Sequence, residues 1–239
     1  MDLKEITGNI LFIDIETAAQ YPDYNSVPPI VQELWAKKTE LRRKREEISP
    51  EEFYETAGIY AEFGRIVCIS AGYFLEEEIK LFFKIKSFYN KDEKLLLEEF
   101  ADTVNKFYSN PDRLLCAHNG KEFDFPYISR RMLINGVKIP DMMDYSGKKP
   151  WEVPYLDTLE LWKFGDHKNY TSLNLLASVF GMPSPKDDLD GSMVNQTFWN
   201  ENDIEKIVTY CEKDIFALGQ VFLKLKGIQV DKQPILLRG

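Results

Sequence analysis

The sequence predicts an α/β fold, in which a mixed β-sheet is flanked by helices and a helical insertion follows the first strand. Three observations lead to this prediction. The segment ILFIDIE at 10–16 is a continuous apolar run with β-branched residues, which is typical of a strand buried on both faces. Strand-like segments at 65–74 and 78–85 come next, and short strands then alternate with helices. Residues 21–64 carry helical patterns instead and therefore interrupt the sheet.

The remaining elements follow in chain order. The segments at 65–74 and 78–85 are expected to form a hairpin. Beyond it, apolar spacing and helix-end residues predict a helix at 91–108, a strand at 113–119, a helix at 125–137, a strand leading into a helix at 153–162, a short helix at 172–182 and a long final helix at about 203–226. We expect the whole chain, 1–239, to form a single domain.

The insertion is expected to contain two helices. The first carries six basic residues interleaved with glutamates, which is typical of a solvent-exposed helix face with ion pairs. Ser49 and Glu52 have the spacing of a capping box, so a second helix is expected to begin there.

Composition limits the classes of protein that this chain can represent. Its net charge of −9 argues against a protein that holds long duplex DNA on a broad basic face, but allows an enzyme that grips a few nucleotides at a strand end. The three cysteines are far apart, which favours buried reduced thiols over a disulfide or a zinc site. No secretory signal and no apolar run of membrane-spanning length are found, so a cytoplasmic protein without membrane association is expected.

Asp14 and Glu16 are the first candidate site residues. Side chains two apart on a strand point to the same face, and this pair is expected at the C-terminal end of the first strand, where open α/β sheets place their active sites. Acid-x-acid pairs also arise by chance in a chain with 39 acidic residues. Unpaired carboxylates on so apolar a strand are rarely tolerated without a function, however.

Asp124, Asp214 and Tyr210 extend the set. Asp124 lies two residues before Pro126, so capping the helix that follows is an equally good interpretation. Asp214 interrupts an apolar stripe of the final helix, where packing alone would place a leucine. Tyr210 lies one turn earlier and is its neighbour on the helix surface, and the alternative is a solvated Asp–Tyr pair at the edge of the stripe.

Carboxylates gathered at one point repel one another unless a cation lies among them. A ligand set of carboxylates without histidine or cysteine favours Mg²⁺ or Mn²⁺, and such ions act on phosphate oxygens. The other polar candidates have simpler interpretations. Asp157 is expected to cap a helix, Asp190 to lie in a solvated turn, and His118 and His167 are too few for a histidine-based metal site or a Ser/His triad.

The ordered motifs DxE at 14–16, NxxxFD at 119–124 and YxxxD at 210–214 resemble the tyrosine subgroup of the DEDD superfamily of 3′–5′ exonucleases. The stretch FDFPYISRR is similar to the second exonuclease motif of family B DNA polymerase proofreading domains. LDTLELW and DGSMVN resemble related stand-alone bacterial exonucleases. The resemblance covers 9–19 and 65–226. The histidine subgroup would need histidine at 209, where this chain has Thr209.

This resemblance implies a ribonuclease H-like fold and hydrolysis of terminal phosphodiester bonds by two Mg²⁺ or Mn²⁺ ions, with release of nucleoside 5′-monophosphates. The implied partner is a nucleic acid with a free 3′ end, preferably single-stranded DNA. In the implied roles Asp14 bridges both ions, Glu16 and Asp214 complete the ion on the nucleophile side, Asp124 holds the second ion through water, and Tyr210 orients the attacking water.

Thr17, Asn119 and Phe123 are the candidate substrate contacts, and Asn119 also holds the loop backbone in this interpretation. Two other functions stay open: a ribonuclease D-like enzyme that degrades RNA, and a catalytically silent nucleic-acid-binding module. The insertion has two open roles as well. It either handles substrate, with Trp35 and Tyr54 stacking on single-stranded ends, or covers the sheet edge.

Overall fold

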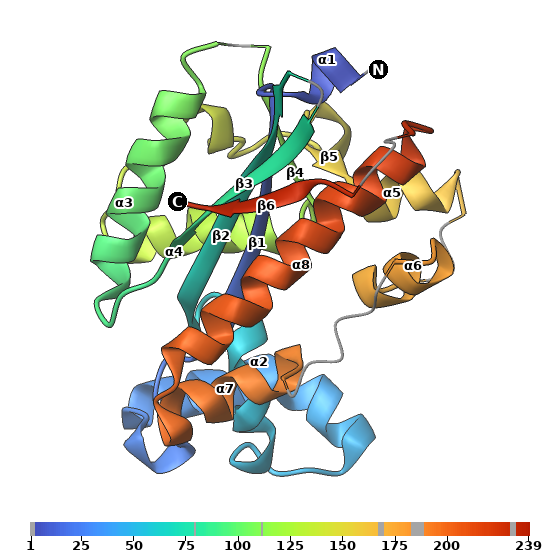
Figure 1. The fold of residues 1–239 in the computed structure, drawn as a ribbon. Coiled ribbons are helices and arrows are strands. Elements are labelled where there is room, and N and C mark those ends of the chain that lie inside the picture. Colours follow the sequence, from blue (N-terminus) through green and yellow to red (C-terminus); the bar gives the residue numbers. More distant parts are fainter. Residues whose placement is uncertain (1–2, 79, 111, 167–169, 183–188, 230–232) are drawn as a thin grey trace.

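The computed structural model describes residues 3–78, 80–110, 112–166, 170–182, 189–229 and 233–239, and these residues form a mixed six-stranded sheet in the order β5-β4-β1-β2-β3-β6 (Figure 1). The strands are β1 (Ile10–Ala19), β2 (Gly64–Glu77), β3 (Lys80–Phe88), β4 (Leu114–Ala117), β5 (Leu156–Asp157) and β6 (Ile235–Arg238). β1 pairs antiparallel with β2 and parallel with β4. The expected α/β mixed sheet with a helical insertion after the first strand is confirmed.

The helices are α1 (Leu3–Ile6), α2 (Pro29–Glu46), α3 (Glu93–Phe107), α4 (Asp124–Ile134), α5 (Thr158–Lys163), α6 (Leu173–Val179), α7 (Val194–Gln196) and α8 (Ile204–Leu225). Short 3₁₀ helices lie at Tyr24–Ser26, Glu52–Ile59, Asp141–Met143, Pro150–Glu152 and Gly191–Met193, and a π-helical turn lies at Thr197–Glu201. α8 crosses one face of the sheet, and α3 and α4 lie on the other (Figure 1). In the part of the chain that the structure describes, no helix is long and apolar enough to cross a membrane.

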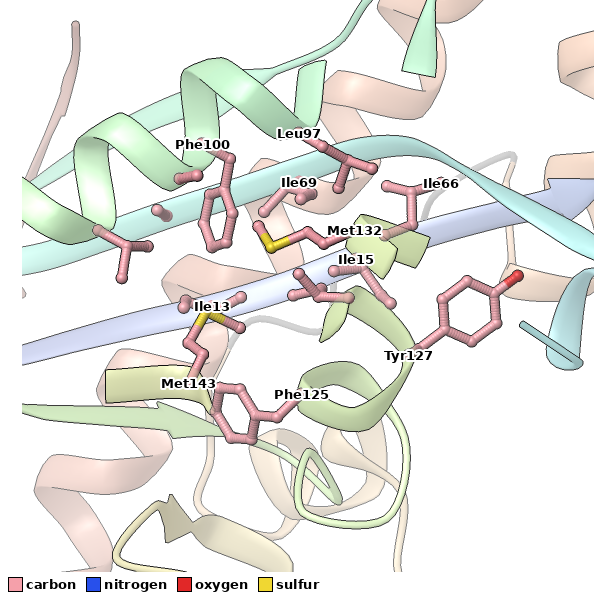
Figure 2. Close-up of a cluster of buried hydrophobic side chains, with 14 of the residues drawn as sticks. Ile13, Ile15, Ile66, Ile69, Leu97, Phe100, Phe125, Tyr127, Met132 and Met143 are labelled. Carbon is pink, nitrogen blue, oxygen red and sulfur yellow. The ribbon is translucent and has the colours of Figure 1, made fainter. Parts of the chain in front are cut away.

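The core beneath α3 and α4 fixes which way the first strand faces. Ile13 and Ile15 of β1 point into a buried cluster with Phe100 of α3 and Met132 of α4 (Figure 2). Because side chains alternate along a strand, Asp14 and Glu16 project from the opposite face, toward α8. The apolar residues of β1 therefore determine the direction of its acidic ones.

α8 packs closely on the face that carries the acids. Phe12 of β1 lies 5.4 Å from Phe222 of α8, measured between ring centroids, and the rings of Phe74 and Phe83 surround it. Gly219 makes this approach feasible, because a Cβ there would lie 2.8 Å from the Phe83 ring. The close contact holds the middle of α8 directly over β1 and β2.

The sequence-based boundary of β1 was wrong in a way that matters for the site. The strand continues to Ala19, so Asp14 and Glu16 lie within it and not at its C-terminal end. Its parallel partner β4 pairs only as far as Phe12, and the register with β2 shifts just after Glu16. The acids therefore lie beside a flank of β1 that β4 leaves open.

The insertion keeps the predicted helical pattern but not the predicted aromatic role. Its capping box is present, with Ser49 N donating to Glu52 Oε2 at 2.8 Å and Glu52 N donating to Ser49 Oγ at 3.1 Å. Ion pairs Lys44–Glu40 and Arg42–Glu46 lie on the exposed face of α2, as expected. Trp35 and Tyr54 are buried in the insertion's own aromatic core, so stacking on nucleic acid by these two rings is excluded.

The insertion packs on the part of β1 that β4 leaves unpaired. The outermost strands of the sheet are β5 and β6, whereas the 3₁₀ helix Glu52–Ile59 packs on β1, and a Cβ at Gly58 would touch the Ala18 backbone at 3.1 Å. The predicted role as a cover of an open strand edge is thus compatible with this packing. Arg131 of α4 joins the two ends of this segment, donating to Gln20 Oε1, just before the insertion, and to the Ala61 carbonyl near its end, at 2.9 Å each. The same guanidinium forms a buried ion pair with Glu93.

Candidate active site

One cleft of about 390 Å³ gathers all the site residues suggested by the sequence. It is lined by the catalytic candidates Asp14, Glu16, Asp124, Tyr210 and Asp214 and by the candidate substrate contacts Thr17, Asn119 and Phe123. These side chains come from β1, from α4 and the turn before it, and from α8. The cleft opens beside the flank of β1 that β4 does not cover.

Asp14 and Glu16 face the α8 side of the sheet. A carboxylate oxygen of each and Sγ of Cys211 all lie within 4.8 Å of one another. The Cys211 thiol donates to Asp14 Oδ2 at 3.4 Å, so it steadies one carboxylate. All three cysteines are buried and free, as the sequence predicted.

Asp124 reaches the cleft from the other layer of the protein. It is the first residue of α4, while the N-cap is Phe123 and makes no side-chain capping bond, so the capping interpretation of Asp124 is wrong. A hydrogen bond from the backbone of Ile15, on the open flank of β1, holds its carboxylate. The early end of β4 thus lets a residue of α4 meet the acids of β1.

The turn before α4 is held by another buried aspartate. Asn119 has a left-handed backbone, with φ of 59°, and its N–H donates to Asp157 Oδ1 at 2.9 Å. Asp157 also accepts from Lys121 N and caps α5 through Leu159 N, which confirms its predicted capping role. The Asn119 backbone therefore sets the turn, and Asp157 stabilises it.

The other polar candidates fall outside the acidic cluster. Asp190 caps a short turn by accepting from Ser192, as expected. His118 lines the cleft, but both of its ring nitrogens are hydrogen-bonded within the protein. Nδ1 lies 2.8 Å from Thr158 Oγ1, and Nε2 lies 2.8 Å from the Thr171 carbonyl oxygen. His167 lies outside the described residues.

α8 contributes the final pair. Tyr210 and Asp214 lie on consecutive turns, both line the cleft, and their side chains are hydrogen-bonded to each other. Cys211 and Ile215 on the same helix are buried, whereas Asp214 is only half-buried because the apolar stripe opens onto the cleft at this level.

The cluster is electrostatically unfavourable without a cation. Burial raises the pKa of Asp14 and of Glu16 well above the usual range, and repulsion from neighbouring carboxylates adds to both shifts. Burial also raises the pKa of Asp124 to about 7, with a contribution from Asp157. Burial and the nearby carboxylates raise the pKa of Tyr210, so its phenol keeps its proton at neutral pH and can donate a hydrogen bond.

Several cleft residues were missed from the sequence. Tyr170, Ser172 and Asn174 line the cleft from the start of α6, and Cys211 contacts Asp14. The segment YTSLN combines an aromatic ring with polar side chains just before an apolar helix, which is a weak local signal. Cys211 could have been found from its position next to Tyr210 on the face of α8 that carries Asp214.

The donor chemistry of the cleft suits hard divalent cations. Carboxylate oxygens that repel one another supply negative charge in a partly buried site, and this favours ions such as Mg²⁺ or Mn²⁺. A mixed α/β sheet with such a cleft is typical of metal-dependent enzymes that hydrolyse phosphate esters.

Comparison with known proteins identifies the family. The chain belongs to the family of predicted 3′–5′ exonucleases related to the exonuclease domain of PolB, whose model matches residues 59–233. This range includes Asp124, Tyr210 and Asp214 but not the two acids of β1. No curated protein matches the chain. The inferred resemblance and the 3′–5′ exonuclease class are thereby confirmed, and exonuclease domains of this type use divalent metals.

A solved structure supports the fold. The family B DNA polymerase from the hyperthermophilic archaeon Pyrobaculum calidifontis matches with 15% sequence identity and a TM-score of 0.55, over 90% of this chain and 24% of the polymerase. The chain thus spans about a quarter of that protein's length, and the ribonuclease H-like fold is confirmed. E. coli exonuclease I in complex with a dT13 oligonucleotide has 12% identity and a TM-score of 0.42, over 90% of this chain and 40% of that one, and is too dissimilar to carry an argument.

Proposed function

We propose that this protein is a metal-dependent 3′–5′ exonuclease that hydrolyses the terminal phosphodiester bond of single-stranded DNA ends and releases nucleoside 5′-monophosphates, acting as one domain. The observation that carries the proposal is the convergence of four acidic residues and a tyrosine, from β1, α4 and α8, in a single cleft. Residues so distant in sequence rarely meet in this combination for packing alone, because their mutual repulsion costs stability.

In this proposal Asp14, Glu16, Asp124 and Asp214 hold two divalent cations, Mg²⁺ or Mn²⁺. When bound, the ions supply charge stabilisation for the attacking and leaving oxygens of an in-line displacement. Asp14 and Glu16 both lie near Asp124 and Asp214, since repulsion from these two carboxylates helps to raise the pKa of each. The cleft carboxylates are the ligand type these ions prefer.

Tyr210 has the chemistry to position the attacking water. Its protonated phenol is hydrogen-bonded to Asp214 and lines the cleft, so it offers a polar oxygen at a defined place without itself taking a proton. Because bound cations would lower the pKa of the attacking water, the phenol would need only to position it.

Substrate contacts come from the walls of the cleft. Phe123 and Tyr170 bring aromatic rings to it, and such rings stack on nucleobases regardless of sequence. Thr17 and Asn119 supply polar groups for the sugar or the phosphate. The volume of about 390 Å³ is in the range of pockets that bind small molecules of about the size of a nucleotide.

The test is digestion of three labelled substrates, single-stranded DNA, duplex DNA and RNA, by the purified protein with Mg²⁺ or Mn²⁺. Internally labelled strands should shorten stepwise from the 3′ end of single-stranded DNA, with nucleoside 5′-monophosphates as products, and EDTA should stop the reaction. Asp14→Ala should lose this activity while keeping its circular dichroism spectrum. Full hydrolysis by Asp14→Ala would overturn the assignment of the site.

The same digestion separates the two other functions. Faster degradation of RNA than of DNA would favour the ribonuclease D-like enzyme. Binding of all three substrates without any shortening, at every metal concentration, would favour the catalytically silent binding module.

A further inference from the structure

A second depression, which we call the α4 groove, lies between α4 and the segment 138–155. Its volume is about 410 Å³. Buried rings lie beneath its lining: Phe125 and Tyr155, 1% and 7% exposed, lie 4.0 Å apart between ring centroids, and the partly buried Tyr145 lies 5.2 Å from Tyr155. None of the acids of the catalytic cleft lines this groove.

The α4 groove is cationic in a chain whose net charge is −9. Lys121, Arg130 and Lys148 line it, against a single acid, Asp144. Arg130 and Lys148 are exposed, and among the described residues neither forms an ion pair with a carboxylate. Lys121 is paired with Glu160 at 2.7 Å. Exposed cations that no carboxylate neutralises match a ligand that carries phosphates.

The segment that forms the far wall of the α4 groove carries the same chemistry onto the surface. It reads DYSGKKPWEV at 144–153, with Lys149 Nζ 5.2 Å from the centroid of the Trp151 ring. Trp151 is 77% exposed, which is unusual for so large an apolar side chain. Lysines interleaved with exposed aromatic rings are typical of surfaces that bind single-stranded nucleic acid.

The α4 groove and the catalytic cleft are lined by neighbouring residues of the same segment. The turn and first residues of α4, 119–126, form the border between them. Asn119, Phe123 and Asp124 line the cleft, whereas Lys121, Phe125 and Pro126 line the groove. Lining residues of the cleft and of the groove therefore alternate along this turn, so the two depressions lie on either side of it.

We propose that the α4 groove, with Lys149 and Trp151 at its rim, binds the single-stranded nucleic acid upstream of the 3′-terminal nucleotide. This inference rests on the proposed function, since it places the 3′ end in the acidic cleft. Arg130, Lys148 and Lys149 contact phosphates, and the exposed ring of Trp151 stacks on a base.

The test measures binding without hydrolysis. Oligothymidylates of 4, 8 and 16 nucleotides carrying a 5′ fluorophore are titrated with the protein in EDTA, and the fluorescence anisotropy is followed. In EDTA the acidic cleft repels phosphate, so the groove dominates binding. The 16-mer should bind at least tenfold more tightly than the 4-mer, and the affinity should fall as salt is added.

Lys148→Glu/Lys149→Glu should weaken binding of the 16-mer at least tenfold and lower the slope of log K against log salt by about 1.4, the value for two lost contacts to a single strand. Trp151→Ala should weaken it about fivefold, the lower limit for loss of one stacked base. Lys80→Glu/Lys84→Glu is the matched control, because these exposed lysines of β3 give the same change in net charge away from the groove.

The proposal is overturned if wild-type protein binds the 4-mer and the 16-mer equally, or if the groove variant and the control weaken binding alike. It is also overturned if polyglutamate binds as tightly as the 16-mer and Trp151→Ala has no effect, because the groove would then recognise negative charge alone. The two proposals can fail separately. If the protein hydrolyses none of the substrates but still binds the 16-mer more tightly than the 4-mer, and the groove variant abolishes this difference, the proposed function is refuted and binding by the α4 groove is supported.

Discussion

Replacing Asp124 with asparagine is expected to stabilise the protein at pH 8 when no divalent cation is present. The carboxyl is 4% exposed, and burial raises its pKa from 3.8 to about 7. A raised pKa in the folded state means that ionisation of the carboxyl opposes folding. The stability associated with the protonated carboxyl is fully present below about pH 4 and is lost as the pH rises through about 7.

The size of the effect follows from the same shift in pKa. A change from 3.8 to about 7 corresponds to an upper limit of about 4 kcal/mol in the free energy of unfolding. The asparagine accepts a weaker hydrogen bond from the Ile15 backbone, which offsets part of this gain. In a domain of this size the remaining gain raises the melting temperature by about 3–10 °C.

The assay is a thermal melt in EDTA from pH 4 to pH 8. The melting temperatures of Asp124→Asn and wild type should coincide near pH 4 and separate as the pH rises. Asp157→Asn is the matched control, since Asp157 is equally buried but accepts hydrogen bonds from several backbone N–H groups, and its loss should lower the melting temperature. A variant at 124 that melts below wild type at pH 8, or a difference independent of pH, would refute this reasoning.

Three further outcomes are expected. Tyr210→Phe should slow nucleotide release about 10- to 100-fold in single-turnover assays, less than Asp14→Ala, because it removes one positioning contact; equal losses would contradict a positioning role. Arg131→Met should lower the free energy of unfolding in urea by about 3–5 kcal/mol, because Glu93 is left buried and unpaired; a loss under about 1 kcal/mol would contradict this. Replacing 25–60 with a short loop should raise KM more than it lowers kcat, since this segment places Ile59 in the lining of the cleft and contributes none of the acids; an unchanged KM would assign it to stability alone.

Local signals explain what could be predicted from the sequence. Asp14 and Glu16 could be identified as candidate site residues because they interrupt an apolar run. Asp214 could be identified because it interrupts the apolar stripe of a helix. The capping roles of Asp157 and of Ser49 depend on neighbours within a few residues, so their patterns were sufficient. In each case the relevant physics acts within one element.

Tertiary contacts explain what could not be predicted. β6 is a short, largely exposed segment whose partner β3 lies far away in the sequence, so no local pattern marks it. Trp35 looked available for stacking, but the rings of Phe53 and Tyr60 enclose it. Asp124 looked like a helix cap because nothing local reveals that β4 ends early and opens a route to β1.

The position of α8 has a consequence for the protein during its synthesis. The helix brings both Tyr210 and Asp214 to the cleft, and it also covers Phe12, Phe74 and Phe83 on one face of the sheet. A nascent chain still lacking α8 therefore lacks two of the proposed site residues and has an exposed aromatic surface at the same time. Ribosome-bound intermediates of this kind carry the hydrophobic surface that chaperones bind. In the proposed function they also lack a complete nuclease site, because the same helix that buries this surface supplies Tyr210 and Asp214.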